Sequence, residues 1–99
     1  QGEATAYDKK QQIEAKRPKS WLKSVSAFAN GEGGTLIFGI SDDDQVVGLE
    51  NAELDSELIS EAIKTKLDPI PSIKLEFQEF DGRKLILLYV APGDETPYY

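Results

Sequence analysis

The apolar residues of this chain follow a helical period in two stretches. Between 20 and 29 they recur at the spacing of one helix face, with Ser20 placed to cap the helix and Asn30-Gly31 placed to end it in a left-handed conformation. A second stripe runs from 51 to 67, with acidic residues at its start, basic residues at its end and two prolines after it. The expected buried positions are Trp21, Leu22, Val25, Phe28 and Ala29 in the first helix, and Leu54, Leu58, Ile59, Ala62 and Ile63 in the second.

Runs typical of strands flank both helices. Apolar and charged residues alternate in 13–16 and 73–80, whereas 35–40 is apolar on both faces, as in a central strand that is covered on both sides. Asp81-Gly82 predicts a hairpin turn, and the acidic turn before residue 45 predicts another. The predicted strands are 13–16, 35–40, 45–49, 73–80 and 84–90, and residues 1–10 are expected to form a loose arm or a leading edge strand.

The predicted elements follow the order β-α-β-β-α-β-β in a single domain that covers residues 1–99. This order predicts an α+β (mixed α/β) fold in which two helices pack on a mostly antiparallel sheet. A chain of 99 residues with 39% hydrophobic side chains has the usual size for one such domain.

Composition removes several classes of function. The chain has no Cys and no His, which excludes thiol nucleophiles, disulfides, Cys/His zinc sites and Ser-His-Asp catalysis. No apolar run approaches the ~20 residues that cross a bilayer, so we expect a cytoplasmic protein without a membrane partner. The chain also has no Met, and we therefore expect it to be a fragment of a longer protein.

The net charge of -7 is divided unevenly along the chain. Residues 1–31 hold six Lys/Arg against three Asp/Glu, whereas residues 32–99 hold five against fifteen. The basic positions of the first part surround the first predicted strand and helix: Lys9, Lys10, Lys16, Arg17, Lys19 and Lys23. We expect Lys16, Arg17, Lys19 and Lys23 to contact nucleic-acid phosphates, the alternative being a solvated basic face without a ligand. Trp21 could stack on a base, but its place on the apolar stripe favours a core role.

The stretch from Ser26 to Asp43 carries a long motif, Ser-Ala-Phe-Ala-Asn followed by Gly-Glu-Gly-Gly and an apolar strand that ends in Gly-Ile-Ser-Asp-Asp. Together with Glu14-Ala15-Lys16 before it and Val47-Gly48-Leu49 after it, this motif resembles the Schlafen/AlbA-like family of DNA-binding domains. The resemblance implies an α/β domain of bacterial transcriptional regulators or helicase-related proteins. The motif residues to which we assign a structural role are Asn30, Gly31, Gly33, Gly34, Gly39 and Gly48.

The family has also been described as a divergent AAA ATPase, which the residues here do not favour. A phosphate-binding loop needs Gly-x-x-x-x-Gly-Lys-Ser/Thr, and no such string occurs. Gly34 and Gly39 have the outer spacing, but Ile40 stands where Lys is required. The glycines also follow a helix, whereas a phosphate-binding nest usually precedes one, so a turn into the buried strand is the favoured role.

In the Schlafen branch the resemblance implies an RNA endonuclease with a metal-bound trio of acidic residues. Glu14 and Asp42 match two of the three positions, and under this alternative they are the candidate catalytic residues and ligands for Mg²⁺ or Mn²⁺. Lys9 occupies the third position, and Asp8 lies one residue away, on the opposite face of a regular strand. We therefore expect a non-catalytic nucleic-acid-binding module without a cofactor. A metal-dependent endoribonuclease stays one alternative, and a domain that forms homo-oligomers through exposed strand edges is another.

Overall fold

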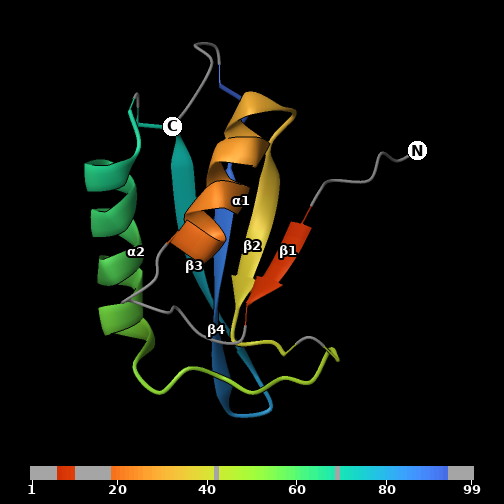
Figure 1. The fold of residues 1–99 in the computed structure, drawn as a ribbon. Coiled ribbons are helices and arrows are strands. Elements are labelled where there is room, and N and C mark those ends of the chain that lie inside the picture. Colours follow the sequence, from red (N-terminus) through yellow and green to blue (C-terminus); the bar gives the residue numbers. More distant parts are fainter. Residues whose placement is uncertain (1–6, 11–18, 42, 69, 94–99) are drawn as a thin grey trace.

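Two helices and a four-stranded sheet make up the fold (Figure 1). The computed structural model describes residues 7–10, 19–41, 43–68 and 70–93. Its elements are β1 (Tyr7–Lys10), α1 (Lys19–Asn30), β2 (Gly34–Phe38), α2 (Ala52–Lys66), β3 (Ile73–Phe80) and β4 (Arg83–Val90). The strand order is β1-β2-β4-β3, with β1 parallel to β2 and the other two neighbouring pairs antiparallel. The predicted α+β fold with a mostly antiparallel sheet is confirmed.

Both helices cover the same face of the sheet. Their apolar stripes and the helix-facing residues of β2 and β4 form one buried cluster: Trp21, Leu22, Val25, Ala29, Leu36, Phe38, Ala52, Ile59, Ile63, Leu67, Ile86, Leu88 and Val90. At its centre the Trp21 ring meets Phe38 edge to face, with 5.7 Å between the ring centroids. The prediction that Trp21 belongs to the core is confirmed, because only 1% of the residue is exposed and no base can stack on it.

The end of α1 and the start of β2 form a tight reversal. The helix ends at Asn30, as predicted, but the residue with a left-handed conformation is Gly33, with φ of +86°, rather than Asn30 or Gly31. The Gly33 amide donates to the Phe28 carbonyl at 2.8 Å, and the Phe28 ring lies against Gly34, where a Cβ would come within 2.6 Å of the ring. These glycines therefore allow the chain to turn under the helix, which supports their structural role.

The second helix has the predicted extent. The Asn51 side chain caps it by accepting from the Leu54 amide at 3.1 Å, and its acidic first turn and basic last turn suit the helix dipole. The predicted apolar stripe is only partly buried, since Ile59 and Ile63 are fully covered whereas Leu54 is 50% exposed and Leu58 is 37% exposed. The side of α2 that carries Leu54 and Leu58 is therefore only partly covered, although Ala52 in the first turn is buried.

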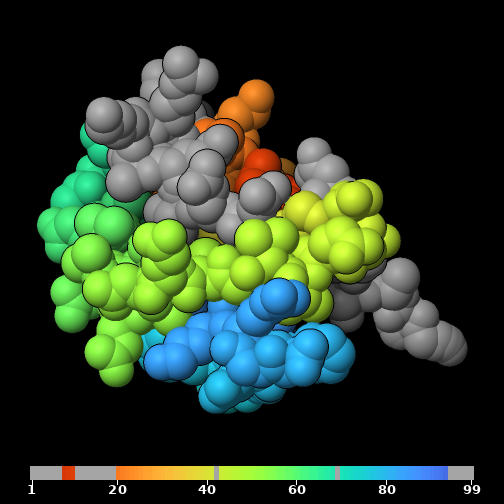
Figure 2. All heavy atoms as spheres, turned by 90° about the horizontal axis from the view of Figure 1, so that it is seen from below, coloured from red at the N-terminus to blue at the C-terminus, as the bar shows by residue number. Residues whose placement is uncertain are grey.

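The prediction of a strand over 45–49 is wrong. A single bridge, Ile40 to Val46, replaces it, and β2 ends at Phe38 rather than at residue 40. Gly39 and Gly48 have φ of +110° and +85°, and the Gly39 carbonyl accepts from the amides of both Val47 and Gly48, so no regular ladder can continue. The segment instead crosses the end of the molecule beside the β3–β4 hairpin (Figure 2), where the Leu49 amide donates to the Lys84 carbonyl at 2.9 Å.

Three further predictions concern the first strand, the start of the first helix and the Asp81-Gly82 turn. Strand β1 confirms a leading edge strand for 7–10 and corrects the alternative of a loose arm there, whereas the strand predicted over 13–16 lies outside the described residues. The helix begins at Lys19, so Ser20 lies within its first turn and is not the cap. The Asp81-Gly82 hairpin is confirmed, with both residues at positive φ.

Substitution of Gly33 by Ala is expected to cost roughly 3 kcal/mol of unfolding free energy, from a strained φ and a forced backbone shift. The new Cβ would lie 2.7 Å from the Val90 carbonyl oxygen and 3.0 Å from Pro92 Cδ. Gly82→Ala is the matched control, because Gly82 has a similar φ of +77° and a Cβ added there would meet no atom within 4 Å. Chemical denaturation should show a cost of about 1 kcal/mol for the control. Equal costs for the two variants would contradict the close packing at Gly33.

Candidate nucleic-acid interface

The parallel pair β1–β2 and the helix that connects them define one end of the sheet. The strands run side by side from Tyr7 opposite Thr35 to Lys10 opposite Phe38, so their carboxyl ends coincide. The Lys10 carbonyl accepts from the amides of Gly39 at 2.7 Å and Ile40 at 3.2 Å, which fixes β1 to the chain that leaves β2. Helix α1 begins at this same end (Figure 1). In folds with such crossovers, ligands bind at the carboxyl ends of the parallel strands.

Asp8 holds β1 against α1. Its Oδ2 accepts from the Ser24 hydroxyl of α1 at 2.8 Å, and its Oδ1 accepts from the backbone amide of Lys9 at 2.9 Å. Its neighbour Lys10 places Nζ at 3.8 Å from Oδ2. Both carboxylate oxygens are therefore occupied by groups of the chain itself, and Asp8 has a positioning role in the described structure.

The acidic turn after β2 lies within reach of β1. Lys9 forms an ion pair with Asp44, which takes a left-handed conformation with φ of +67°. Ser41 organises this turn, because its hydroxyl donates to Asp43 and accepts from the Gln45 amide at 3.2 Å. Asp43 and Asp44 are exposed, as expected for a solvated turn, and Asp42 before them lies outside the described residues.

The structure places part of the predicted basic cluster at this end of the sheet. Lys9 and Lys10 lie on β1 beside carboxylates of the chain, Lys19 is the first residue of α1, and Lys23 is exposed one turn further along the helix. Lys16 and Arg17 lie outside the described residues. Of the four residues predicted to contact phosphates, Lys19 and Lys23 are thus one turn apart in the sequence of α1, and the phosphate contacts of all four stay a prediction.

The acidic trio of the nuclease alternative is not tested by these contacts. In the ranges 7–10, 19–41, 43–68 and 70–93, no three carboxylates lie close enough together to hold a metal ion. Glu14 and Asp42 both fall in the gaps between these ranges, so their role as Mg²⁺ or Mn²⁺ ligands stays a prediction. Neither of the two described helices is long and apolar enough to cross a membrane.

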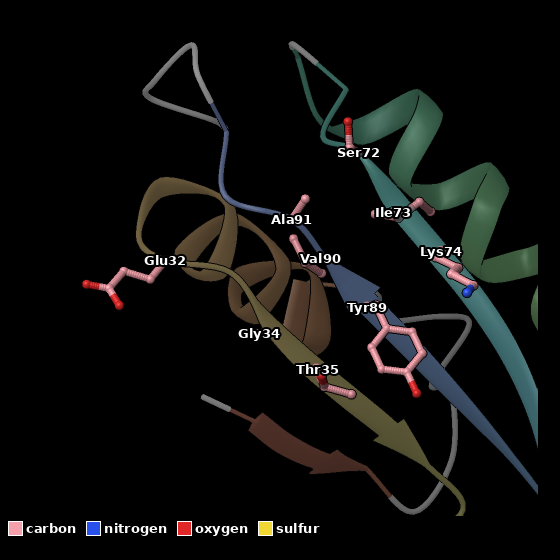
Figure 3. Close-up of a pocket in the computed structure, with 9 residues that line it drawn as sticks. All are labelled: Glu32, Gly34, Thr35, Ser72, Ile73, Lys74, Tyr89, Val90 and Ala91. Atoms are coloured by element: carbon pink, nitrogen blue, oxygen red, sulfur yellow. The ribbon is translucent and has the colours of Figure 1, made fainter. Parts of the chain in front are cut away.

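The sequence did not predict that one face of the sheet would carry neither of the described helices. On this face the side chains of Thr35, Tyr89 and Lys74 lie in one row across three strands and line an open groove of about 340 Å³ (Figure 3). The Tyr89 hydroxyl donates to Glu76 Oε1 at 2.7 Å, and this bond is the main reason that the pKa of Tyr89 is raised, with burial and the charge of Glu76 adding to it. The alternation of apolar and polar residues over 73–78 was the sequence signal for a solvated face.

Comparisons with known proteins agree with this fold. The Schlafen, AlbA_2 family matches residues 3–99 of the chain, which confirms the expected family. Among solved structures, the N-terminal domain of a Nitrosomonas europaea protein described as related to the ATP-dependent DNA helicase RecG is 23% identical, with a TM-score of 0.72. A Corynebacterium diphtheriae protein is 24% identical, also with a TM-score of 0.72. No curated protein matches the chain.

These two structures also show how much of each relative the fold occupies. The similarity covers 96% of this chain and 68% of the Nitrosomonas domain, against 95% of this chain and 19% of the Corynebacterium protein. In the latter, the shared domain is thus a small part of a longer chain.

The bond between Asp8 and Ser24 can be measured by a double-mutant cycle of Asp8→Ala and Ser24→Ala. We expect a coupling of about 1 kcal/mol in unfolding free energy, as is typical of a partly exposed bond to a charged group. The control cycle pairs Asp8→Ala with Lys10→Ala, whose looser ion pair should couple by less than about 0.5 kcal/mol. A larger coupling for the control than for Ser24 would show that Asp8 does not act through α1.

Proposed function

Because the chain belongs to the Schlafen, AlbA_2 family, we propose that it is a non-catalytic nucleic-acid-binding module. In this proposal Lys16, Arg17, Lys19 and Lys23 contribute the phosphate contacts. The Nitrosomonas relative, described as related to a DNA helicase, supports nucleic acid as the partner. DNA is the polymer that this relative's description favours.

The observation that carries the proposal is the way in which β1 and α1 are joined. The contact between Asp8 and Ser24 holds the two elements together, and the segment between Lys10 and Lys19 contributes Lys16 and Arg17. Lys9 and Lys10 already lie beside Asp44 and Asp8, so their charges are largely offset within the chain. The cations that remain for phosphates are those of the connection and of α1.

The negative charge of the rest of the chain supports a contact that is confined to this end. Helix α2 carries four acidic residues, namely Glu53, Asp55, Glu57 and Glu61. The pKa of Asp55 is raised, first by its partial burial and then by the nearby charge of Glu50. A surface where carboxylates crowd in this way repels phosphates, and we expect the isolated domain to bind nucleic acid weakly.

We further propose that the domain works as one part of a larger cytoplasmic protein of the transcriptional-regulator kind. Both solved relatives come from bacteria, and in one of them the shared domain is a fifth of the chain or less. Weak binding by a single module is useful in such a protein, because a second binding module raises the effective affinity of the first.

The proposal predicts salt-dependent binding of short DNA, measured by fluorescence anisotropy of a labelled duplex and of a labelled single strand at several salt concentrations. On the duplex, each lost phosphate contact should lower the slope of log K against log salt by about 0.9. Lys23→Ala should therefore reduce the slope by about 0.9, and Lys16→Ala/Arg17→Ala by about twice that amount.

The matched control is Lys64→Ala/Lys66→Ala, which removes two exposed cations from the last turn of α2. This variant loses the same charge as the double variant of the basic connection but should leave the salt slope unchanged. Absence of binding at low salt, binding without salt dependence, or an equal loss in the control would overturn the proposal.

A further inference from the structure

Strand β3 forms one border of the described sheet, and no described strand pairs with its outer edge. It is eight residues long and pairs on one side with β4, from Ile73 opposite Val90 to Phe80 opposite Arg83. In the view from below, the turn of the β3–β4 hairpin lies at the margin of the molecule (Figure 2). Such an edge can accept a further strand through its free backbone groups.

The backbone groups that face outward can be identified from one hydrogen bond. The Ala91 amide donates to the Ser72 carbonyl at 3.0 Å. In the β3–β4 pair, the even-numbered residues of β3 therefore point their amides and carbonyls toward β4. By alternation, the outward groups belong to Ile73, Leu75, Phe77 and Glu79. A partner strand must therefore bond to these four residues.

The side chains of β3 divide between the two faces of the sheet. Ile73, Leu75 and Phe77 lie on the helix-covered face, opposite the core residues of β4, yet Phe77 is 52% exposed. Lys74 and Glu76 lie on the face that carries no helix. The edge thus offers an apolar row on one face and a pair of opposite charges on the other.

We infer that the occupant of this edge is a second copy of the same strand, antiparallel and centred on Leu75. A two-fold axis normal to the sheet leaves the helix-covered faces of the two copies on the same side. It pairs odd-numbered residues of β3 with odd-numbered ones, and even-numbered residues with even-numbered ones. Centred on Leu75, it sets Ile73 opposite Phe77 on the apolar side and Lys74 opposite Glu76 on the other, each twice.

The neighbouring registers are chemically worse. An axis through Glu76 places two copies of Glu76 opposite each other, and like charges in that position repel. An axis through Phe77 sets Leu75 against Glu79 and Lys74 against Phe80, so neither charge meets its opposite. The charges of Lys74 and Glu76 therefore specify the register of the two strands. The hydrogen bond from the Tyr89 hydroxyl to Oε1 of Glu76 holds that carboxylate in place and leaves Oε2 for the lysine of the second copy.

The test is sedimentation velocity of the 99-residue chain over a range of concentrations, combined with charge reversal. We expect a monomer–dimer equilibrium. Lys74→Glu or Glu76→Lys alone should weaken it about tenfold, because each change creates two like-charge pairs across the axis. The double variant Lys74→Glu/Glu76→Lys places opposite charges across the axis again and should restore dimerisation. Because this variant also loses the hydrogen bond from Tyr89 to Glu76, its dimerisation should equal that of Tyr89→Phe, which lacks the same bond.

Hydrogen exchange gives a second readout that does not depend on mass. The amides of Ile73, Leu75 and Phe77 should exchange more slowly as the protein concentration rises, whereas those of Lys74 and Glu76, already bonded to β4, should not change. A chain that stays monomeric at every concentration, or a dimer that neither single reversal weakens, would overturn the inference. Weakening by Lys66→Glu to the same extent would also overturn it, since Lys66 belongs to the last turn of α2 and not to β3.

Discussion

Packing of both helices on a single face of the sheet is the constraint on which the rest of the molecule depends. Trp21 of α1 meets Phe38 of β2, and Ile59 and Ile63 of α2 complete the same buried cluster. Because one face of a sheet of this size takes up both apolar stripes, neither described helix covers the other face or the β3 edge. Within the described residues, the groove beside Tyr89 and the outer side of β3 without a partner strand are consequences of this arrangement.

The same packing determines where the basic part of the chain lies. Since α1 must return from the end of β1 to the start of β2, its first turn stands at the carboxyl ends of the two parallel strands. Asp8, Ser24 and the sharp turn at Gly33 keep this crossover tight. Lys16, Arg17, Lys19 and Lys23 all fall in this connection and in α1, so a chain of net charge -7 still gathers positive charge in one part of its sequence.

Local signals predicted most of the fold. The helical period gave both helices to within one or two residues, and Asp81-Gly82 gave the hairpin, because these features depend on neighbours in the sequence. The second hairpin failed because Gly39 and Gly48 take positive φ and interrupt the ladder, and only the tertiary fold shows that a side chain at either position would meet Leu85 or Arg83. Leu54 and Leu58 look like core residues in the sequence but stay partly exposed, which a helical period cannot reveal.

The candidate site could be predicted less well, for a physical reason. Charge alone groups Lys9, Lys10 and Lys23 together, whereas the ion pair of Lys9 with Asp44 and the closeness of Lys10 to Asp8 depend on the tertiary fold. Our proposal that the connection before α1 and α1 itself hold the phosphates is tested by mapping the amide chemical-shift changes when a short DNA duplex is added to the chain. It predicts that the largest changes fall at Lys16, Arg17, Lys19 and Lys23. Larger changes at Thr35, Lys74 and Tyr89, on the face without helices, would contradict it.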